Sequence, residues 1–242
     1  MTDVWIDQVE QKILEFANDY GIIFSHSVRQ VAASFEIGCF HSLTEFYSKY
    51  FILSPQNLTD IGEYKYLTTP SGNPENFSYV KIEGKHSSYE LRQQVRIISH
   101  LDSDISVTPD LVVIFEDTEF HANKRSDYAS GKRPFYCVDS KSVVAIHECK
   151  SMVPFPELLV GFIGMLTTTH CWFNAEDPHF KISDQGQHLA PTLFIGGDAR
   201  SIHLKMIAAL ERTYPINIAI GFHIGTFSLF SNNRRLRLLE ES

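Results

Sequence analysis

Two acidic residues and one lysine lie where apolar segments begin or end. Asp110 precedes the apolar run LVVIF, and Glu148 and Lys150 close the segment VVAIHECK, residues 143–150. Residues i and i+2 of a strand point to the same face, so Glu148 and Lys150 would lie side by side. If the two segments pair as antiparallel strands, the start of the first meets the end of the second. The three side chains would then converge.

Carboxylates that converge repel each other unless a cation joins them. Mg²⁺ is the expected cation, because it prefers oxygen ligands, is held by one or two carboxylates and keeps positions for water and phosphate. A lysine beside such an ion can position a water molecule or neutralise charge on a phosphorus-centred transition state. The pattern therefore indicates metal-assisted hydrolysis of a phosphate ester.

The elements that would position these residues follow from the hydrophobic pattern along the chain. Apolar residues at helical spacing predict amphipathic helices, and short apolar or alternating runs predict strands. The expected helices are 3–20, 28–50, 158–173 and 199–215, the expected strands are 88–98, 106–116, 143–150, 190–198 and 217–225, and loops are expected from 54 to about 78. The helix at 158–173 is apolar nearly all round and should be buried. We expect one α/β domain, residues 1–242, with a central mixed β-sheet flanked by helices.

The pair Pro109-Asp110 followed by Glu148-Cys149-Lys150 resembles the motif of the PD-(D/E)xK nuclease superfamily. The expected order of helix, three strands, helix and strand is similar to the restriction-endonuclease-like core of that superfamily. The resemblance covers about residues 28–200, with an extra N-terminal helix and a C-terminal helix-strand unit. It implies a Mg²⁺-dependent nuclease, with Mn²⁺ as substitute, in which Asp110, Glu148 and Lys150 are catalytic. It also implies that Asp110, Glu148 and the backbone carbonyl of Cys149 bind the metal.

The triplet alone is weak evidence, because the chain holds five D/E-x-K triplets, which begin at Glu10, Glu63, Glu83, Asp139 and Glu148. Context favours the last one. Glu148 is expected to be the only member that ends an apolar strand, and Pro109-Asp110 is the only Pro-Asp pair in the chain. The alternative interpretation is a surface ion pair at a frayed strand end, with Asp110 a turn residue, and such pairs contribute little stability.

Members of this superfamily often add an acidic residue from the first core helix to the metal site. Glu36 and Glu45 are the candidates here. Glu36 lies in the apolar sequence ASFEIGCFHS, where an unpaired carboxylate would be costly and a metal would explain it. Glu45 shares a helix face with His41 and Lys49, which indicates solvent. We therefore expect Glu36 to complete the site, although a glutamate hydrogen-bonded within its own helix explains the pattern nearly as well.

A polar segment, residues 121–135, separates the two strands that carry the acids. Its basic residues, Lys124, Arg125, Lys132 and Arg133, are candidates for nucleic-acid binding through phosphate contacts. A solvated hairpin turn explains them equally well. The antiparallel geometry would also place Asp110 and Glu148 away from the tip of this loop. His147 and Cys149 should face away from Glu148 and pack inward.

Charge and cysteine content narrow the range of functions. The 21 basic and 29 acidic residues give a net charge of −8, which argues against a broad nucleic-acid coat. Phosphate must then bind through local basic groups, a bound cation or a partner subunit. The four cysteines form no C-x-x-C pair and are expected to be buried thiols in a reducing compartment. With no signal-peptide pattern and no long apolar run, we expect a soluble cytoplasmic protein.

The expected function is that of a DNA endonuclease acting as the effector of a bacterial restriction or defence-type system, with a partner subunit or as a homo-oligomer. DNA is preferred to RNA only because it dominates among the similar nucleases. Two alternatives remain open. The first is a non-catalytic subunit of the same fold that binds DNA or scaffolds a complex, and the second is a metal-free protein-interaction module.

Overall fold

The structure is a computed structural model that describes residues 4–24, 31–70, 72–123, 135–171, 179–230 and 235–241. The α-helices among these residues are α1 (Val4–Tyr20), α2 (Val31–Tyr47), α3 (Pro156–Thr169) and α4 (Ser201–Thr213). The strands are β1 (Ile23–Phe24), β2 (Ile52–Gln56), β3 (Glu63–Tyr64), β4 (Tyr79–Glu83), β5 (Ser88–Gln93), β6 (Arg96–Ile98), β7 (Ser106–Val107), β8 (Leu111–Phe115), β9 (His121–Asn123), β10 (Phe135–Asp139), β11 (Val143–Lys150), β12 (Phe180–Ile182), β13 (His188–Leu189), β14 (Thr192–Ile195), β15 (Asn217–Ala219) and β16 (Leu238–Glu241). Two short 3₁₀ helices, η1 (Pro74–Asn76) and η2 (Ser140–Ser142), complete the set.

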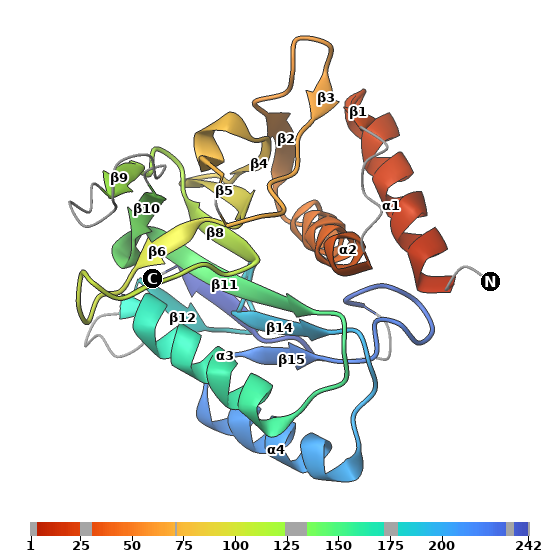
Figure 1. Cartoon of the computed structure of the whole chain (residues 1–242), viewed down its shortest axis with the longest axis vertical. Helices are drawn as coiled ribbons and strands as arrows, with labels where there is room; N and C mark the ends of the chain where they lie inside the picture. Colours follow the sequence, from red (N-terminus) through yellow and green to blue (C-terminus); the bar gives the residue numbers. More distant parts are fainter. Residues whose placement is uncertain are drawn as a thin grey trace, which may run out of the picture.

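A mixed sheet of seven strands, in the order β15-β14-β11-β8-β5-β4-β2, forms the centre of the fold (Figure 1). The strand β8 runs antiparallel to both β5 and β11, while β11, β14 and β15 are parallel. In the β8–β11 pair, His147 lies opposite Leu111. Asp110 and Glu148 are therefore the next residues along this ladder, at one end of the sheet, as the antiparallel pairing predicted.

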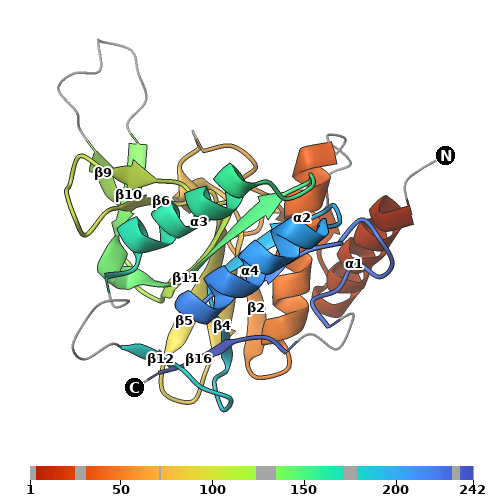
Figure 2. The ribbon, with the colours of Figure 1, turned by 90° about the horizontal axis from the view of Figure 1, so that it is seen from below.

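Helices cover both faces of the sheet, which confirms the expected α/β class and the central mixed sheet flanked by helices. One hydrophobic core contains side chains of α1 and α2, such as Trp5 and Phe40, packed on the sheet. The other contains side chains of α3 and α4, such as Phe162 and Ile207, packed on the opposite face. Figure 1 shows α3 and α4 lying side by side, apart from α1 and α2, and Figure 2 views the molecule from the side of α3 and α4.

Two of the expected strands are interrupted. The segment 88–98 splits into β5 and β6 because Gln94 adopts a left-handed conformation with φ 52°, and the two strands belong to different sheets. The segment 106–116 also splits into two strands of different sheets, β7 and β8, with Thr108, Pro109 and Asp110 between them. Both breaks lie beside the converging acids. β6 and β7 join β9 and β10 in a second, four-stranded sheet.

Other expectations are corrected by packing. The segment expected as loop contains β3 and most of β2, and the following strand β4, with alternating burial, was not predicted. Helix α3 is not buried all round, because it packs on the sheet with one face and leaves Val160 56% exposed. The last expected strand, 217–225, is only three residues long as β15.

None of the helices in the described ranges is long and apolar enough to span a membrane. All four cysteines are free thiols, and Cys39, Cys137 and Cys149 are buried, as expected, whereas Cys171 is only partly buried.

Candidate active site

Asp110, Glu148 and Lys150 meet at the end of the β8–β11 ladder. The Nζ atom of Lys150 lies 3.1 Å from Oδ2 of Asp110 and 2.6 Å from Oε1 of Glu148. The two acidic residues are buried, at 7% and 8% exposure, whereas the lysine is partly exposed. The ammonium group therefore bridges two carboxylates that have little contact with solvent.

Backbone groups fix the orientation of both carboxylates. The N–H of Cys149 donates to Oδ2 of Asp110 at 2.8 Å, and the N–H of Asp110 donates to Oε2 of Glu148 at 3.3 Å. Charge-assisted hydrogen bonds of this kind stabilise an ionised carboxylate. Cys149 thus contacts the site through its N–H, and metal binding by its carbonyl stays a prediction.

Helix α2 brings a third acid, Glu36, to this cluster through Gln94. The amide nitrogen Nε2 of Gln94 donates to Oδ1 of Asp110 at 3.1 Å and reaches Oε2 of Glu36 at 3.4 Å. Of the two candidates on this helix, Glu36 is the one that lies beside the other acids. Its role as a metal ligand stays a prediction.

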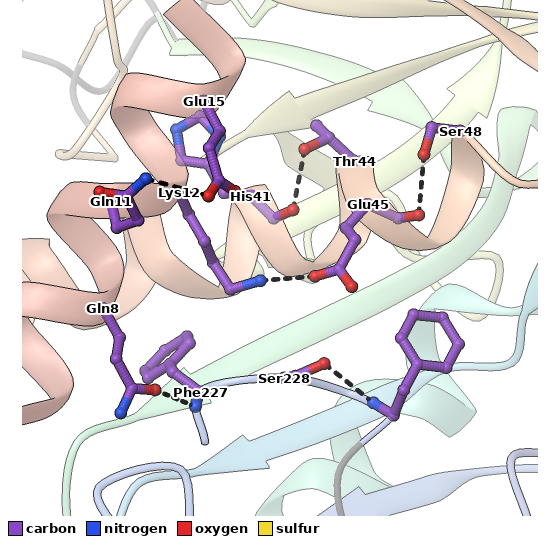
Figure 3. Close-up of polar contacts among 11 residues, drawn as sticks. Gln8, Gln11, Lys12, Glu15, His41, Thr44, Glu45, Ser48, Phe227 and Ser228 are labelled. Atoms are coloured by element: carbon purple, nitrogen blue, oxygen red, sulfur yellow. Dashed lines mark hydrogen bonds and ion pairs between the residues drawn. The ribbon is translucent and has the colours of Figure 1, made fainter.

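Glu45, the other candidate, is occupied elsewhere. It accepts a hydrogen bond from Lys12 of α1, nine residues along the helix from Glu36 (Figure 3). His41 lies on the same stretch of α2, but it is buried and hydrogen-bonded to Tyr66. The sequence predicted that this face is exposed to solvent, and the structure shows that it is partly covered. The prediction of an exposed face was wrong because α1 covers this part of α2.

The charges of the cluster do not balance. Burial, and then the nearby charge of Asp110, raises the pKa of Glu36 to about 7. The same two causes raise the pKa of Glu148. Burial alone would lower the pKa of Lys150, but the attraction of Asp110 and Glu148 outweighs it and raises that pKa. With all three acids ionised, one lysine leaves an excess of two negative charges, which a divalent cation would neutralise.

The donor set fits a hard divalent cation, because every acidic ligand offers oxygen atoms and no thiol or imidazole is required. Within the described ranges, however, no group of three or more His, Cys, Asp or Glu side chains is arranged to hold a metal ion as it stands. The ammonium group of Lys150 instead contacts two of the carboxylates. Metal binding would therefore require these side chains to rearrange.

Comparison with the other D/E-x-K triplets corrects one expectation. Glu83 ends β4 and Asp139 ends β10, so Glu148 is not the only member of a triplet at a strand end. Burial separates them instead. The side chains of Glu83 and Asp139 are 42% and 41% exposed, whereas that of Glu148 is 11% exposed.

The remaining candidates have mixed outcomes. His147 and Cys149 pack inward as expected, at 0% and 4% exposure. The four basic residues of the insertion, Lys124, Arg125, Lys132 and Arg133, lie outside the described residues. The first described residue after them, Phe135, lies under the guanidinium of Arg96 at 3.8 Å, only two residues from Gln94.

Gln94 is the member of the cluster that sequence reasoning missed. Its signal was weak: two adjacent amides, Gln93 and Gln94, interrupt an otherwise alternating strand. Nothing in that pattern indicates that the second of them turns out of the strand toward Asp110.

Neither protein-family models, nor curated proteins, nor solved structures give a significant match to this chain.

Proposed function

We propose that this protein is a metal-dependent nuclease that hydrolyses phosphodiester bonds in DNA. The observation that supports this most strongly is the meeting of Asp110, Glu148 and Lys150 at one end of adjacent antiparallel strands, with Glu36 beside them. A structural ion pair explains the contact of Lys150 with one acid. It does not explain why a second acid contacts the same lysine and a third, Glu36, lies beside them through Gln94, since uncompensated charge in a partly buried position is costly.

The arrangement of elements also favours a restriction-endonuclease-like core. The helix α2, the antiparallel strands β5, β8 and β11, the helix α3 and the parallel strand β14 follow in the order that the PD-(D/E)xK resemblance implies. In this proposal α1 and the α4–β15 unit are additions. Asp110 immediately precedes β8 and Glu148 lies in β11, and these are the two strands to which the resemblance would assign the motif acids.

Asp110, Glu148 and Glu36 would hold Mg²⁺ or Mn²⁺, with the Cys149 carbonyl as a further ligand. When bound, such an ion lowers the pKa of water and stabilises charge on the phosphoryl group. The buried backbone N–H groups of Cys149 and Asp110 orient the two motif carboxylates. Asp110 and Glu148 raise the pKa of Lys150, so without a bound ion the lysine holds its proton. Beside a bound ion its ammonium group would position a water molecule or neutralise charge on the phosphoryl group.

The net charge of −8 limits how the substrate can be bound. A phosphate backbone would be attracted only near the metal and near local basic groups, of which Lys124, Arg125, Lys132 and Arg133 are the candidates. A partner subunit or a second copy could supply further contacts. This pattern suits an effector in a bacterial restriction or defence-type system, which we propose by analogy with similar nucleases.

Cleavage of supercoiled plasmid DNA in Mg²⁺ tests the proposal, with a single-stranded RNA as second substrate. We expect nicking by the wild type, loss of at least a hundredfold in Lys150→Ala, and wild-type rates in Lys141→Ala. Lys141 belongs to the exposed triplet at the end of β10 and is a matched control. Nicking that survives Lys150→Ala would contradict the proposal. DNA binding that persists without any cleavage would favour a non-catalytic subunit instead.

A further inference from the structure

Gln94 has a backbone conformation that its residue type disfavours. Among the described residues, only three non-glycine residues have a positive φ, namely Asn57, Gln94 and Asp117. Asparagine and aspartate tolerate this region because their short polar side chains bond locally, but glutamine has no such advantage. The cost is about 1–2 kcal/mol. Strain of this kind persists only where the surroundings fix it, and it is frequent at functional sites.

The conformation has a clear structural effect. It ends β5, and it lets the N–H of Gln94 donate to the carbonyl of Asp110 at 3.0 Å. It also turns the side chain toward the acids, where Nε2 donates to Asp110 and reaches Glu36. Gln94 is itself buried, at 7% exposure. Gln94 thus contacts the backbone carbonyl of Asp110, the side-chain carboxylate of Asp110 and the carboxylate of Glu36.

We propose that Gln94 is a positioning residue that sets the affinity of the acidic cluster for its metal ion. This inference rests on the proposed function. Glu36 and Asp110 come from different elements and repel each other, so without a shared donor Glu36 can turn away toward solvent. The Gln94 amide keeps both carboxylates oriented toward one point. Hydrogen-bond donors that orient metal ligands contribute about 10–100-fold in metal affinity.

Two substitutions separate this role from a purely structural one. Gln94→Met keeps the length of the side chain and the energetic cost of the positive φ, but it removes the side-chain amide that donates the hydrogen bonds. Gln94→Gly removes the side chain and also relieves the backbone, so it should not lower stability through strain. Asp117→Gly is the matched control, because it relieves the same kind of backbone conformation away from the cluster.

The experiment is calorimetric titration of Mn²⁺ into each full-length variant, with thermal unfolding in EDTA on the same samples. We expect both Gln94 variants to bind Mn²⁺ about 10–100-fold more weakly than the wild type, with Asp117→Gly unchanged. The glycine variant should unfold in EDTA at or above the wild-type temperature. Wild-type affinity in either folded Gln94 variant would overturn the inference and leave the nuclease proposal intact. Absence of Mn²⁺ binding to the wild type would instead contradict the proposed function itself.

Discussion

Replacement of Glu36 by glutamine should stabilise the protein while it damages the proposed metal site. The pKa of Glu36 is raised from 4.5 to about 7, first by burial and then by the charge of Asp110. A carboxylate with a raised pKa in the folded state opposes folding once it ionises. This cost is absent below pH 4.5, grows as the pH rises toward 7, and is complete above that. Glutamine has nearly the same shape without the charge.

The expected size of the effect follows from the two pKa values. Each pKa unit corresponds to about 1.4 kcal/mol, so the difference sets an upper limit of about 3.4 kcal/mol at pH 8. Glu36 is only partly buried, and solvent screening reduces this to about 1–2 kcal/mol. For a chain of this size, that corresponds to a rise in Tm of about 2–8 °C. Near pH 5 the difference should fall to about a quarter of this value, because most of the cost arises between pH 5 and pH 7.

Thermal unfolding in EDTA at pH 8 and pH 5 measures this directly. Glu45→Gln is the matched control on the same helix, because that substitution removes the charge of the ion pair with Lys12 and relieves no repulsion. Its Tm should stay the same or fall at pH 8. A Glu36→Gln protein that is less stable than the wild type at pH 8 would refute the reasoning, because Glu36 would then be a stabilising residue and not a strained member of an acidic cluster.

Three further predictions follow from charge and packing. Lys150→Met should lower the free energy of unfolding in EDTA by about 2–3 kcal/mol, because it leaves two buried carboxylates without their shared cation; equal stability in urea titrations would argue against the bridge. Four buried histidines have pKa values lowered to about 3 by burial, and they are His41, His147, His170 and His188. Below pH 6.5 these histidines take up a proton in the unfolded chain but not in the folded protein, so each histidine should lower the free energy of unfolding by about 2 kcal/mol at pH 5. A urea midpoint that does not change between pH 7.5 and 5 would be inconsistent with their burial. Gly38→Ala should destabilise the protein, because a Cβ atom would lie 2.5 Å from Val9 and 2.7 Å from Phe227. Gly161 has open space around it on α3, so Gly161→Ala should stabilise the protein by about 0.5–1 kcal/mol. A lower unfolding temperature for Gly161→Ala than for Gly38→Ala would contradict this packing.

The convergence of Asp110, Glu148 and Lys150 could be predicted from the sequence because it depends on two local rules. The side-chain alternation of a strand places Glu148 and Lys150 on one face, and antiparallel pairing brings the start of β8 to the end of β11. Both rules act on short apolar segments that are visible in the sequence. Their roles in catalysis stay predictions.

The contribution of Gln94 could not be predicted, because it arises from tertiary contacts. A glutamine inside an alternating segment is expected to continue the strand, and only the contacts with Asp110 and Glu36 explain its left-handed turn. The exposure of Val160 was missed for a related reason. An apolar side chain in the first half of α3 is predicted to be buried by composition alone, but the sheet covers only one face of that helix.

The choice between Glu36 and Glu45 is an intermediate case. Apolar neighbours indicated that Glu36 is at least partly buried, and it is partly buried in the structure. The contact of Glu45 with Lys12 of α1 could not be predicted without knowing how the two helices pack. Sequence patterns thus identified which acid is costly to bury, but not which partner compensates each one.

Calorimetric titration of Mn²⁺ into the wild type, Asp110→Ala and Asp139→Ala tests the central claim most directly, since it examines the acidic cluster without the need for a substrate. Asp139 begins a D/E-x-K triplet at a strand end but is exposed, so it controls for the loss of one surface carboxylate. The account predicts binding to the wild type and to Asp139→Ala, and its loss in Asp110→Ala. If the wild type binds no Mn²⁺ even with DNA present, or if Asp110→Ala binds as well as the wild type, the acidic cluster of Asp110, Glu148 and Glu36 is not a metal site and the nuclease proposal is contradicted.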